Sequence, residues 1–358
     1  MVGLYAKGNC TLDQIQRTVK ASSTLNLTNI SHIQELLQNI RHSSPAGSFE
    51  GNAHFAALER YLDNSLLLYS DIDTEYRRRK LLVSQGLVMP TTYKIGTRRN
   101  VSATGVQQTV DVTAQYVSVV DTLSNINPDT RSNWSHPLSL PTTMKSYEDT
   151  ATFQYSDFYR AHPSAFRLTL YHDDIECGNN VGSRAGVNKL TMFYMAVNNG
   201  TSERQTKGKL TSIHLVLICH ASDITQYGYG VIMKPLLNDL IRLDQGVQIV
   251  NRFGDSSIIH GRLEHLAGDN LAANQLLGLV TSFTKSYFCR FCYISAALPI
   301  HYTTALDAPK RTAETHQRDV LMALNDPEHY KTSGVKGACV FDELDYFCGV
   351  EHTVPDIM

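Results

Sequence analysis

The sequence lacks the features that define several protein classes. It contains no uninterrupted apolar run of about 18 residues, so no transmembrane helix and no membrane partner are predicted. Its opening segment, MVGLYAKGNC, lacks the long apolar stretch of a secretory signal, and an intracellular location is expected. No internal repeat and no low-complexity tract interrupts the chain, so a repeat architecture is excluded.

Charge is also scarce. Charged residues make up 18% of the chain, and the formal net charge is −2. A domain dedicated to nucleic-acid binding is often strongly basic, and this chain is not. Any surface that binds DNA must therefore be a local concentration of basic residues.

The cysteines do not form a disulfide framework. There are 7 of them, an odd number, and most lie far apart in the sequence. Such a pattern is typical of a protein from a reducing compartment. Only Cys289 and Cys292 form a close pair.

The 358 residues, 42% of them hydrophobic, can bury a large core and suggest more than one domain. Residues 1–125 are predicted to be a mainly helical N-terminal region. Within it, Thr11-x-x-Gln14 and Ser31-x-x-Gln34 fit capping boxes that would begin helices. A linker is predicted over 126–150, which is rich in Ser and Thr and holds three prolines.

The main domain is predicted over 151–288, followed by a Cys/His-containing segment over 289–358. Strands are expected at 166–171, 190–197, 212–219, 247–250 and 258–265. Helices are expected at 231–245, ended by Gly246, and from Asn270, as its N-cap, to Leu277. This order predicts an α/β fold with a mixed sheet flanked by helices.

Three aspartates lie where predicted strands end. Asp173 and Asp174 end the first strand of the main domain, and Asp269 follows a later one. Active groups of α/β sheets gather at strand ends, and carboxylates there can hold Mg²⁺ or Mn²⁺ through oxygen. Two such ions can activate a nucleophile and stabilise the leaving oxygen in phosphodiester cleavage. A single aspartate after a strand is, however, more often a turn or cap residue.

The wider pattern resembles a known family. The segments LTLYHDDIECGNNVGSRAGVNKLTMFYMAVNN, KLTSIHLVLICHASDITQYGYGVIMKPLLNDLIRLDQGVQI and RLEHLAGDNLAANQLLGLVTSFTKSYFCRFC resemble the transposases of CACTA-type (En/Spm-like) DNA transposons. In that family a strand ends in a Y-x-D carboxylate, a GD-x-A-like carboxylate follows an apolar strand, and a Cys-x-x-Cys comes next. The resemblance covers about residues 160–295. By position, Asp173 matches the first carboxylate and Asp269 the second, with Asp174 as the alternative for the first.

This resemblance implies an RNase H-like catalytic core that acts in the nucleus. It also implies binding of transposon-end DNA, metal-dependent cleavage and strand transfer, and assembly as a homo-oligomer on DNA. The family has a third acidic residue after the cysteine-containing insertion. Glu343, Glu351 and Asp356 are the local alternatives, and none matches well. We therefore expect a truncated copy that lacks one catalytic carboxylate, and we do not predict activity for this chain by itself.

Cys289-x-x-Cys292 has the spacing of half a structural Zn²⁺ site. Two ordinary buried cysteines are the alternative, and a redox pair is less favoured because no thioredoxin-like context surrounds the motif. The resemblance also favours zinc here. His316, like His301, lies near the pair in sequence and is the suggested further ligand, while Cys339 and Cys348 are softer ligands. The full set of residues that could complete the site is His301, His316, His329, Cys339, Cys348 and His352.

Three functions therefore compete. The first is a transposase or transposase-derived enzyme, with Asp173 and Asp269 as catalytic metal ligands. The second is a DNA- or protein-binding module that kept the fold without catalysis. The third is a zinc-stabilised interaction protein in which both aspartates are structural. His172 and His265, near the strand ends, are expected to be structural histidines under each hypothesis.

Overall fold

The computed structural model describes residues 12–45, 53–66, 72, 74–101, 105, 107–126, 149–176, 189–198, 213–251, 254–284, 287–295 and 308–354. The chain divides into two compact units, Met1–Leu87 and Val88–Met358. None of the described helices is long and apolar enough to cross a membrane.

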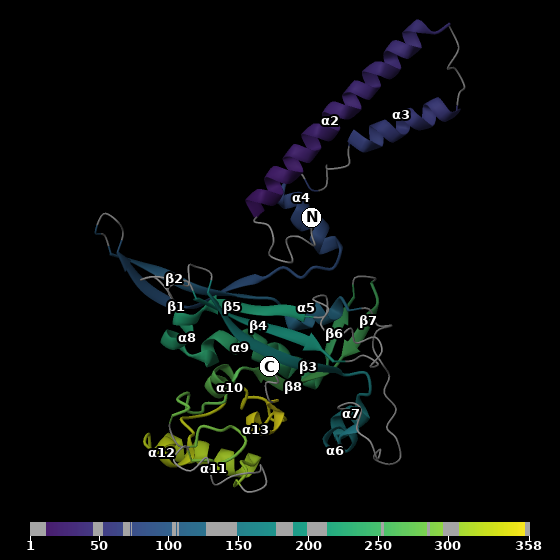
Figure 1. The fold of residues 1–358 in the computed structure, drawn as a ribbon. Coiled ribbons are helices and arrows are strands. Elements are labelled where there is room, and N and C mark those ends of the chain that lie inside the picture. The colour runs from purple at the N-terminus through teal and green to yellow at the C-terminus, as the bar shows by residue number, and fades with distance from the viewer. Residues whose placement is uncertain are drawn as a thin grey trace. The chain divides into compact units, whose positions relative to one another are not determined.

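The described residues of the first unit are mainly helical. It contains α2 (Leu12–Ser43), α3 (Ala53–Leu66) and α4 (Glu75–Ser84), seen at the purple end of Figure 1. Asn26 Nδ2 donates to Ser65 O (2.8 Å) between α2 and α3, and Ile30 and Leu62 are buried. Ser31 lies inside the continuous helix α2, so the capping box predicted there is wrong. Thr11 lies outside the described residues.

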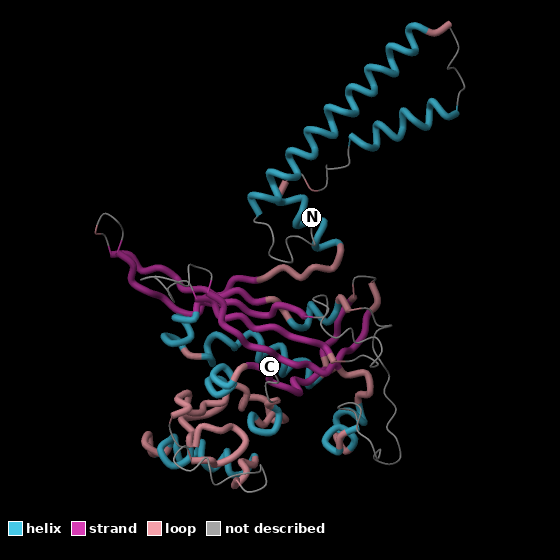
Figure 2. Tube along the Cα trace, in the orientation of Figure 1, coloured by secondary structure: helices cyan, strands magenta, loops and turns pink. Residues whose placement is uncertain are grey.

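A six-stranded sheet forms the centre of the second unit, and Figure 2 shows its strands in magenta. The strands are β1 (Thr91–Val101), β2 (Gln107–Tyr116), β3 (Phe166–Glu176), β4 (Lys189–Val197), β5 (Ile213–His220) and β8 (Gly261–Gly268). Their order across the sheet is β1-β2-β5-β4-β3-β8. Every neighbouring pair is antiparallel except β3 and β8, which are parallel. The fold is therefore α/β with a mixed sheet, as predicted.

The parallel pair requires a long crossover. Between β5 and β8 the chain forms α8 (Ala221–Tyr227), α9 (Tyr229–Gln245) and a separate hairpin of β6 (Val247–Val250) and β7 (Ser256–Ile259). The helix predicted over 231–245 is confirmed, and its buried side includes Ile232, Leu236, Leu240 and Leu243. Gly246 ends α9 at φ 91°, a backbone conformation in which glycine is favoured.

Shorter helices complete the second unit. They are α5 (Val119–Ser124), α6 (Ala151–Gln154), α7 (Asp157–Ala161), α10 (Asn270–Leu276), α11 (Ala313–Asn325), α12 (Tyr330–Ser333) and α13 (Gly349–His352). One continuous buried cluster joins strands of the main sheet, α9 and apolar residues from Leu276 to Phe347. The segment after 289 thus shares the core of the sheet rather than forming a core of its own.

Two features differ from the sequence-based expectation. Strands β1 and β2, assigned to the N-terminal region 1–125, pair into the main sheet through Gln115 and Tyr116 of β2. The apolar run predicted as one strand over 258–265 is divided at His260 between β7 and β8. Tertiary pairing decides both, because strand partners distant in sequence leave no local signal. Most of the predicted linker, 127–148, lies outside the described residues.

Candidate metal site at the ends of two parallel strands

The parallel pairing of β3 and β8 brings two of the predicted residues to one edge of the sheet. The β3–β8 register ends with the pair His172 and Gly268, so Asp173 and Asp269 are the next residues of the two strands. Asp269 follows β8, whereas β3 continues to Glu176 through its pairing with β4, so the prediction that Asp173 and Asp174 end their strand is wrong. They are 96 residues apart in sequence (269 − 173). Both are exposed. We call Asp173 and Asp269 the strand-end carboxylates.

Asp173 is held by the backbone N–H of the residue that follows it. Its Oδ1 accepts a hydrogen bond from Asp174 N (2.8 Å), and the described residues provide it with no ion pair. A carboxylate left exposed in this way keeps most of its acceptor capacity for a ligand.

Asp269 is the N-cap of α10, a role that the sequence analysis gave to Asn270. Asp269 Oδ1 accepts from Ala272 N (2.6 Å), whereas Asn270 Oδ1 accepts from Arg290 Nη1 (2.6 Å). The prediction that Asn270 is the cap is therefore wrong by one residue. An ionised carboxylate has about four acceptor positions, and the N-cap bond uses one of them. The other oxygen of Asp269 therefore remains available to a ligand.

Asp174 is bound in a different way. It accepts from Lys189 Nζ (2.8 Å) and from Thr191 Oγ1 (2.5 Å), both on the neighbouring strand β4. Burial by itself would raise the pKa of Asp174, but the hydrogen bonds from Lys189 and Thr191 outweigh it and lower the pKa. The side chain is thus neutralised by protein groups. Successive residues of a strand point to opposite faces, which separates the side chain of Asp174 from that of Asp173.

His172 lies between these carboxylates and the core. Its ring is buried, stacks on Phe193 (centroids 4.6 Å apart) and meets Tyr229 edge-on (5.9 Å). Neither ring nitrogen has a hydrogen-bond partner. Burial lowers the pKa of His172, while Asp174, Asp173 and Asp269 all act to raise it. The ring contacts are typical of a core histidine. The effects on its pKa indicate that all three carboxylates lie within electrostatic range of the imidazole.

Among the described residues, no group of three or more His, Cys, Asp and Glu side chains lies close enough to hold a metal ion. Thus Asp173, Asp174 and Asp269 do not form such a group, and neither do Cys289, Cys292 and His316. The alternatives for a third carboxylate do not join the strand-end carboxylates: Glu343 pairs with Lys234 (2.9 Å), Glu351 lies on α13, and Asp356 lies outside the described residues.

The second predicted site begins with two neighbouring thiols. Cys289 Sγ accepts a hydrogen bond from Phe291 N (3.4 Å), and both cysteines are free and partly buried. Burial and the neighbouring Cys289 raise the pKa of Cys292. The raised pKa favours the neutral thiol of Cys292, and a metal or another positive charge would stabilise its thiolate.

His316 is buried on α11, and neither of its ring nitrogens has a partner. Burial lowers its pKa, and Arg311 lowers it further. Of the other proposed ligands, His329 is bound to Asp319, His352 Nδ1 accepts from Cys348 N (3.0 Å), and Cys339 is buried. His301 lies outside the described residues.

The structure also contains a buried polar cluster that the sequence analysis missed. We call it the Arg311 network. Arg311 donates to Cys289 O (2.9 Å) through Nε and to Tyr287 O (3.0 Å) through Nη2, and its Nη1 lies 3.8 Å from Asp319 Oδ2. Asp319 also accepts from Tyr293 Oη (2.7 Å) and contacts His329 Nε2 (3.1 Å). The network holds the backbone of the Cys289–Cys292 turn. Its members are scattered along the chain, so no short sequence motif predicts it.

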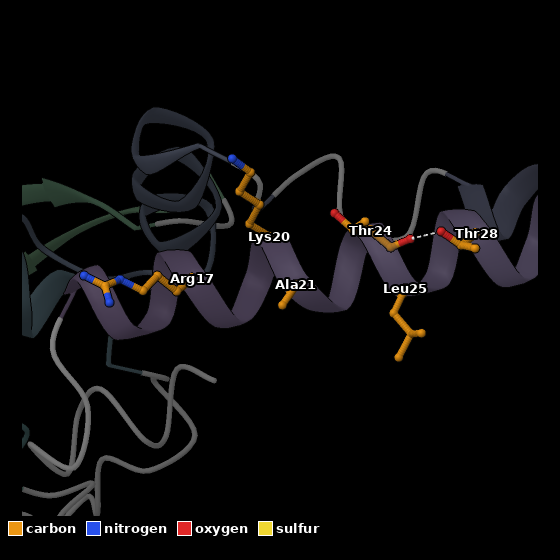
Figure 3. Close-up of a pocket in the computed structure, with 6 residues that line it drawn as sticks. All are labelled: Arg17, Lys20, Ala21, Thr24, Leu25 and Thr28. Carbon is orange, nitrogen blue, oxygen red and sulfur yellow. Dashed lines mark hydrogen bonds between the residues drawn. The ribbon is translucent and has the colours of Figure 1, made fainter.

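A shallow hollow on α2 carries no comparable chemistry. Its lining is Arg17, Lys20, Ala21, Thr24, Leu25 and Thr28, and Figure 3 shows that all six belong to one helix. The only bond drawn there runs from Thr28 Oγ1 to Thr24 O (2.9 Å) along the helix.

Comparison with known proteins does not extend these findings: no protein-family model matches the chain, and no curated protein matches it.

Proposed function

We propose that this chain is a transposase-derived protein whose RNase H-like core acts on DNA in the nucleus, at transposon ends. The observation that supports the proposal is the parallel register of β3 and β8, in which Asp173 and Asp269 are the residues next to the last pair, His172 and Gly268. Three antiparallel strands, a helical crossover and a fourth strand parallel to the first form the arrangement expected of that core. The resemblance of the sequence segments adds independent support.

The strand-end carboxylates fit a divalent cation by donor type. They are exposed oxygen ligands, and among the described residues no cation neutralises them. Asp173 and the free oxygen of Asp269 would hold Mg²⁺ or Mn²⁺. The bound ions would supply charge stabilisation for cleavage of a phosphodiester. The role of the protein is to fix the two carboxylates on rigid strand ends; a third ligand is not among the described residues near them.

Zn²⁺ at Cys289 and Cys292 is a separate part of the proposal. The support is the thiol pair and the N–H donor aimed at one sulfur, an arrangement suited to a thiolate. His316 does not share a metal-binding group with the thiols among the described residues, so its role as a ligand rests on its nearness in sequence and on its unpartnered ring.

A non-catalytic DNA- or protein-binding module is the second candidate. Asp269 already has a structural role as the N-cap of α10, and Asp174 is neutralised by Lys189. Both observations are compatible with a core that keeps its fold without catalysis. In that case any homo-oligomer on DNA would serve binding only.

Mn²⁺ binding separates the two candidates without requiring turnover. Titration of the purified chain with Mn²⁺, followed by electron paramagnetic resonance, should show a site whose affinity falls at least tenfold in Asp173→Asn and in Asp269→Asn. Asp157→Asn is the matched control, because Asp157 is an exposed aspartate on α7. Unchanged Mn²⁺ affinity in both variants would exclude the metal site. Where wild-type protein nicks supercoiled plasmid with Mn²⁺, Asp269→Asn should abolish the nicking.

A further inference from the structure

The β1–β2 hairpin extends beyond the rest of the sheet. Only Gln115 and Tyr116, at the end of β2, pair with β5, while β1 and β2 pair with each other over their full length from Thr91–Tyr116 to Val101–Gln107. Figure 1 shows the two strands running out past their neighbours at one end of the sheet. An isolated two-stranded ribbon is marginally stable in water, so a long one needs support at its base.

The base of the hairpin is well supported. Ile95, Val112, Ala114 and Tyr116 are buried in the main core. The Tyr227 ring of α8 lies against Gly96, where an added Cβ would come within 2.2 Å of a ring carbon. Tyr227 Oη also donates to Thr97 O (2.8 Å). The hairpin is therefore held firmly at Gly96 and projects from there.

No described residue in the outer half of the hairpin is fully buried. We call residues 97–101 and 107–110 the arm. Arg98, Arg99, Asn100 and Val101 are exposed, and so are Gln107, Gln108 and Thr109 opposite them. About 3.3 Å per residue gives the five residues 97–101 a length of about 16 Å. Such a projection contributes little to folding and provides a narrow, polar, accessible ribbon.

The charge of the arm is of one sign. From Ile95 to Val110 the sequence holds Arg98 and Arg99 and no Asp or Glu. The nearest acidic residue, Asp111, is paired with Lys94 (2.6 Å), and no ion pair with either arginine occurs among the described residues. Arg98 and Arg99 are consecutive in a strand, so their side chains leave opposite faces of the ribbon. In a chain with a net charge of −2, this is a local basic feature of the kind that DNA binding would require.

We propose that the arm enters a groove of duplex DNA, with Arg98 and Arg99 contacting the two walls of the groove. This inference rests on the proposed function, because it names the part of the chain that holds the DNA. The major groove, about 12 Å wide, admits a two-stranded ribbon, and phosphates line both of its walls. Arginines on opposite faces match two walls, while Asn100, Gln107 and Gln108 offer amide groups suited to base edges.

The competing occupant is a strand from another protein, because β1 is an edge strand. Basic residues on such a strand oppose edge-to-edge pairing, and an acid-free pair of arginines favours a polyanion instead. Measurement of DNA affinity distinguishes the two occupants.

The test is DNA affinity of the full chain without cleavage. Fluorescence anisotropy of a labelled 30-base-pair duplex, in EDTA, gives Kd over a series of NaCl concentrations. We expect R98A/R99A to raise Kd about tenfold or more at 0.1 M NaCl. The slope of log Kd against log salt should fall by up to about 1.8, since each phosphate contact contributes about 0.9. R98K/R99K, which keeps both charges, should recover most of the salt slope.

The matched control is R318A/K336A, which removes two positive charges from exposed positions elsewhere in the same unit. It should leave Kd within about twofold of wild type. Equal loss in the control, an unchanged Kd in R98A/R99A, or no duplex binding by wild type would each overturn the arm proposal. Equal affinity for a single-stranded oligonucleotide would also overturn it, because a groove exists only in a duplex. Failure of the wild-type protein to bind Mn²⁺ would instead refute the proposed function, and it would not change the result for the arm.

Discussion

The strand-end carboxylates carry exposed charge, whereas the Arg311 network holds buried charge. Asp173 and Asp269 are exposed, and protein groups leave oxygens of both available. Asp319 is buried and bonded to Tyr293 and His329 beside the fully buried side chain of Arg311. Burying an ionised group without partners is prohibitively unfavourable, so buried charge must be satisfied internally. Charge that is left open on a rigid sheet edge is available to a ligand.

The largest expected effect comes from breaking the buried member of this comparison. Asp319→Ala leaves Arg311 buried without its counter-charge and removes the acceptor of Tyr293 and His329. Loss of one partner of a buried pair lowers the free energy of unfolding by about 3–5 kcal/mol. Urea unfolding followed by circular dichroism measures it.

The control for that experiment is Asp173→Ala, which should change the free energy of unfolding by less than about 0.5 kcal/mol, because the side chain is exposed. Similar losses in the two variants would show that the contrast between the regions is incorrect.

His172 sharpens the comparison through pH. Burial lowers its folded-state pKa below the ordinary value of 6.5. Above pH 6.5 neither state binds the proton; as pH falls below 6.5, the unfolded state binds it first and stability is lost. The loss continues down to the folded pKa, at up to about 1.4 kcal/mol per pH unit. His172→Phe can keep the stacking on Phe193 and removes the titrating group. From pH 7.5 to pH 5.5, its free energy of unfolding should therefore rise by about 1 kcal/mol relative to that of wild type.

Unfolding midpoints in urea across that pH range test this effect. His42→Phe, at the exposed end of α2, is the control and should leave the pH profile unchanged. A His172→Phe profile parallel to that of wild type would contradict the assignment of His172 as a buried neutral histidine.

The smallest effect belongs to the Asp174–Lys189 pair. Both side chains are partly exposed, so Lys189→Met should lower the free energy of unfolding by less than about 1 kcal/mol at neutral pH. The lowered pKa of Asp174 means that this contribution is present above pH 3.8 and is lost as pH falls through the folded pKa. High salt should reduce it in the wild type. A loss larger than that of Asp319→Ala would reverse the ranking of exposed and buried charge.

Local sequence patterns were sufficient for several elements at the centre of the second unit. The period of the apolar residues in α9 and the glycine after it determined both the helix and its end. The apolar runs at β3, β4 and β5 were long enough to be recognised as strands. The N-cap at Asp269 was missed by one residue, because Asp and Asn are equally good caps and adjacent in the sequence.

The sequence by itself determined the strands β3, β4 and β5, the helix α9, the position of Asp269 after an apolar strand, and the absence of acidic residues from Ile95 to Val110. Only the tertiary structure decided that β3 and β8 are parallel neighbours, that Asp174 is neutralised by Lys189, and that the β1–β2 hairpin joins the sheet and projects from it. The physical reason is that periodicity reports which face of an element is apolar. Register, ion pairing and the choice of a strand's neighbour depend on residues far away in the chain.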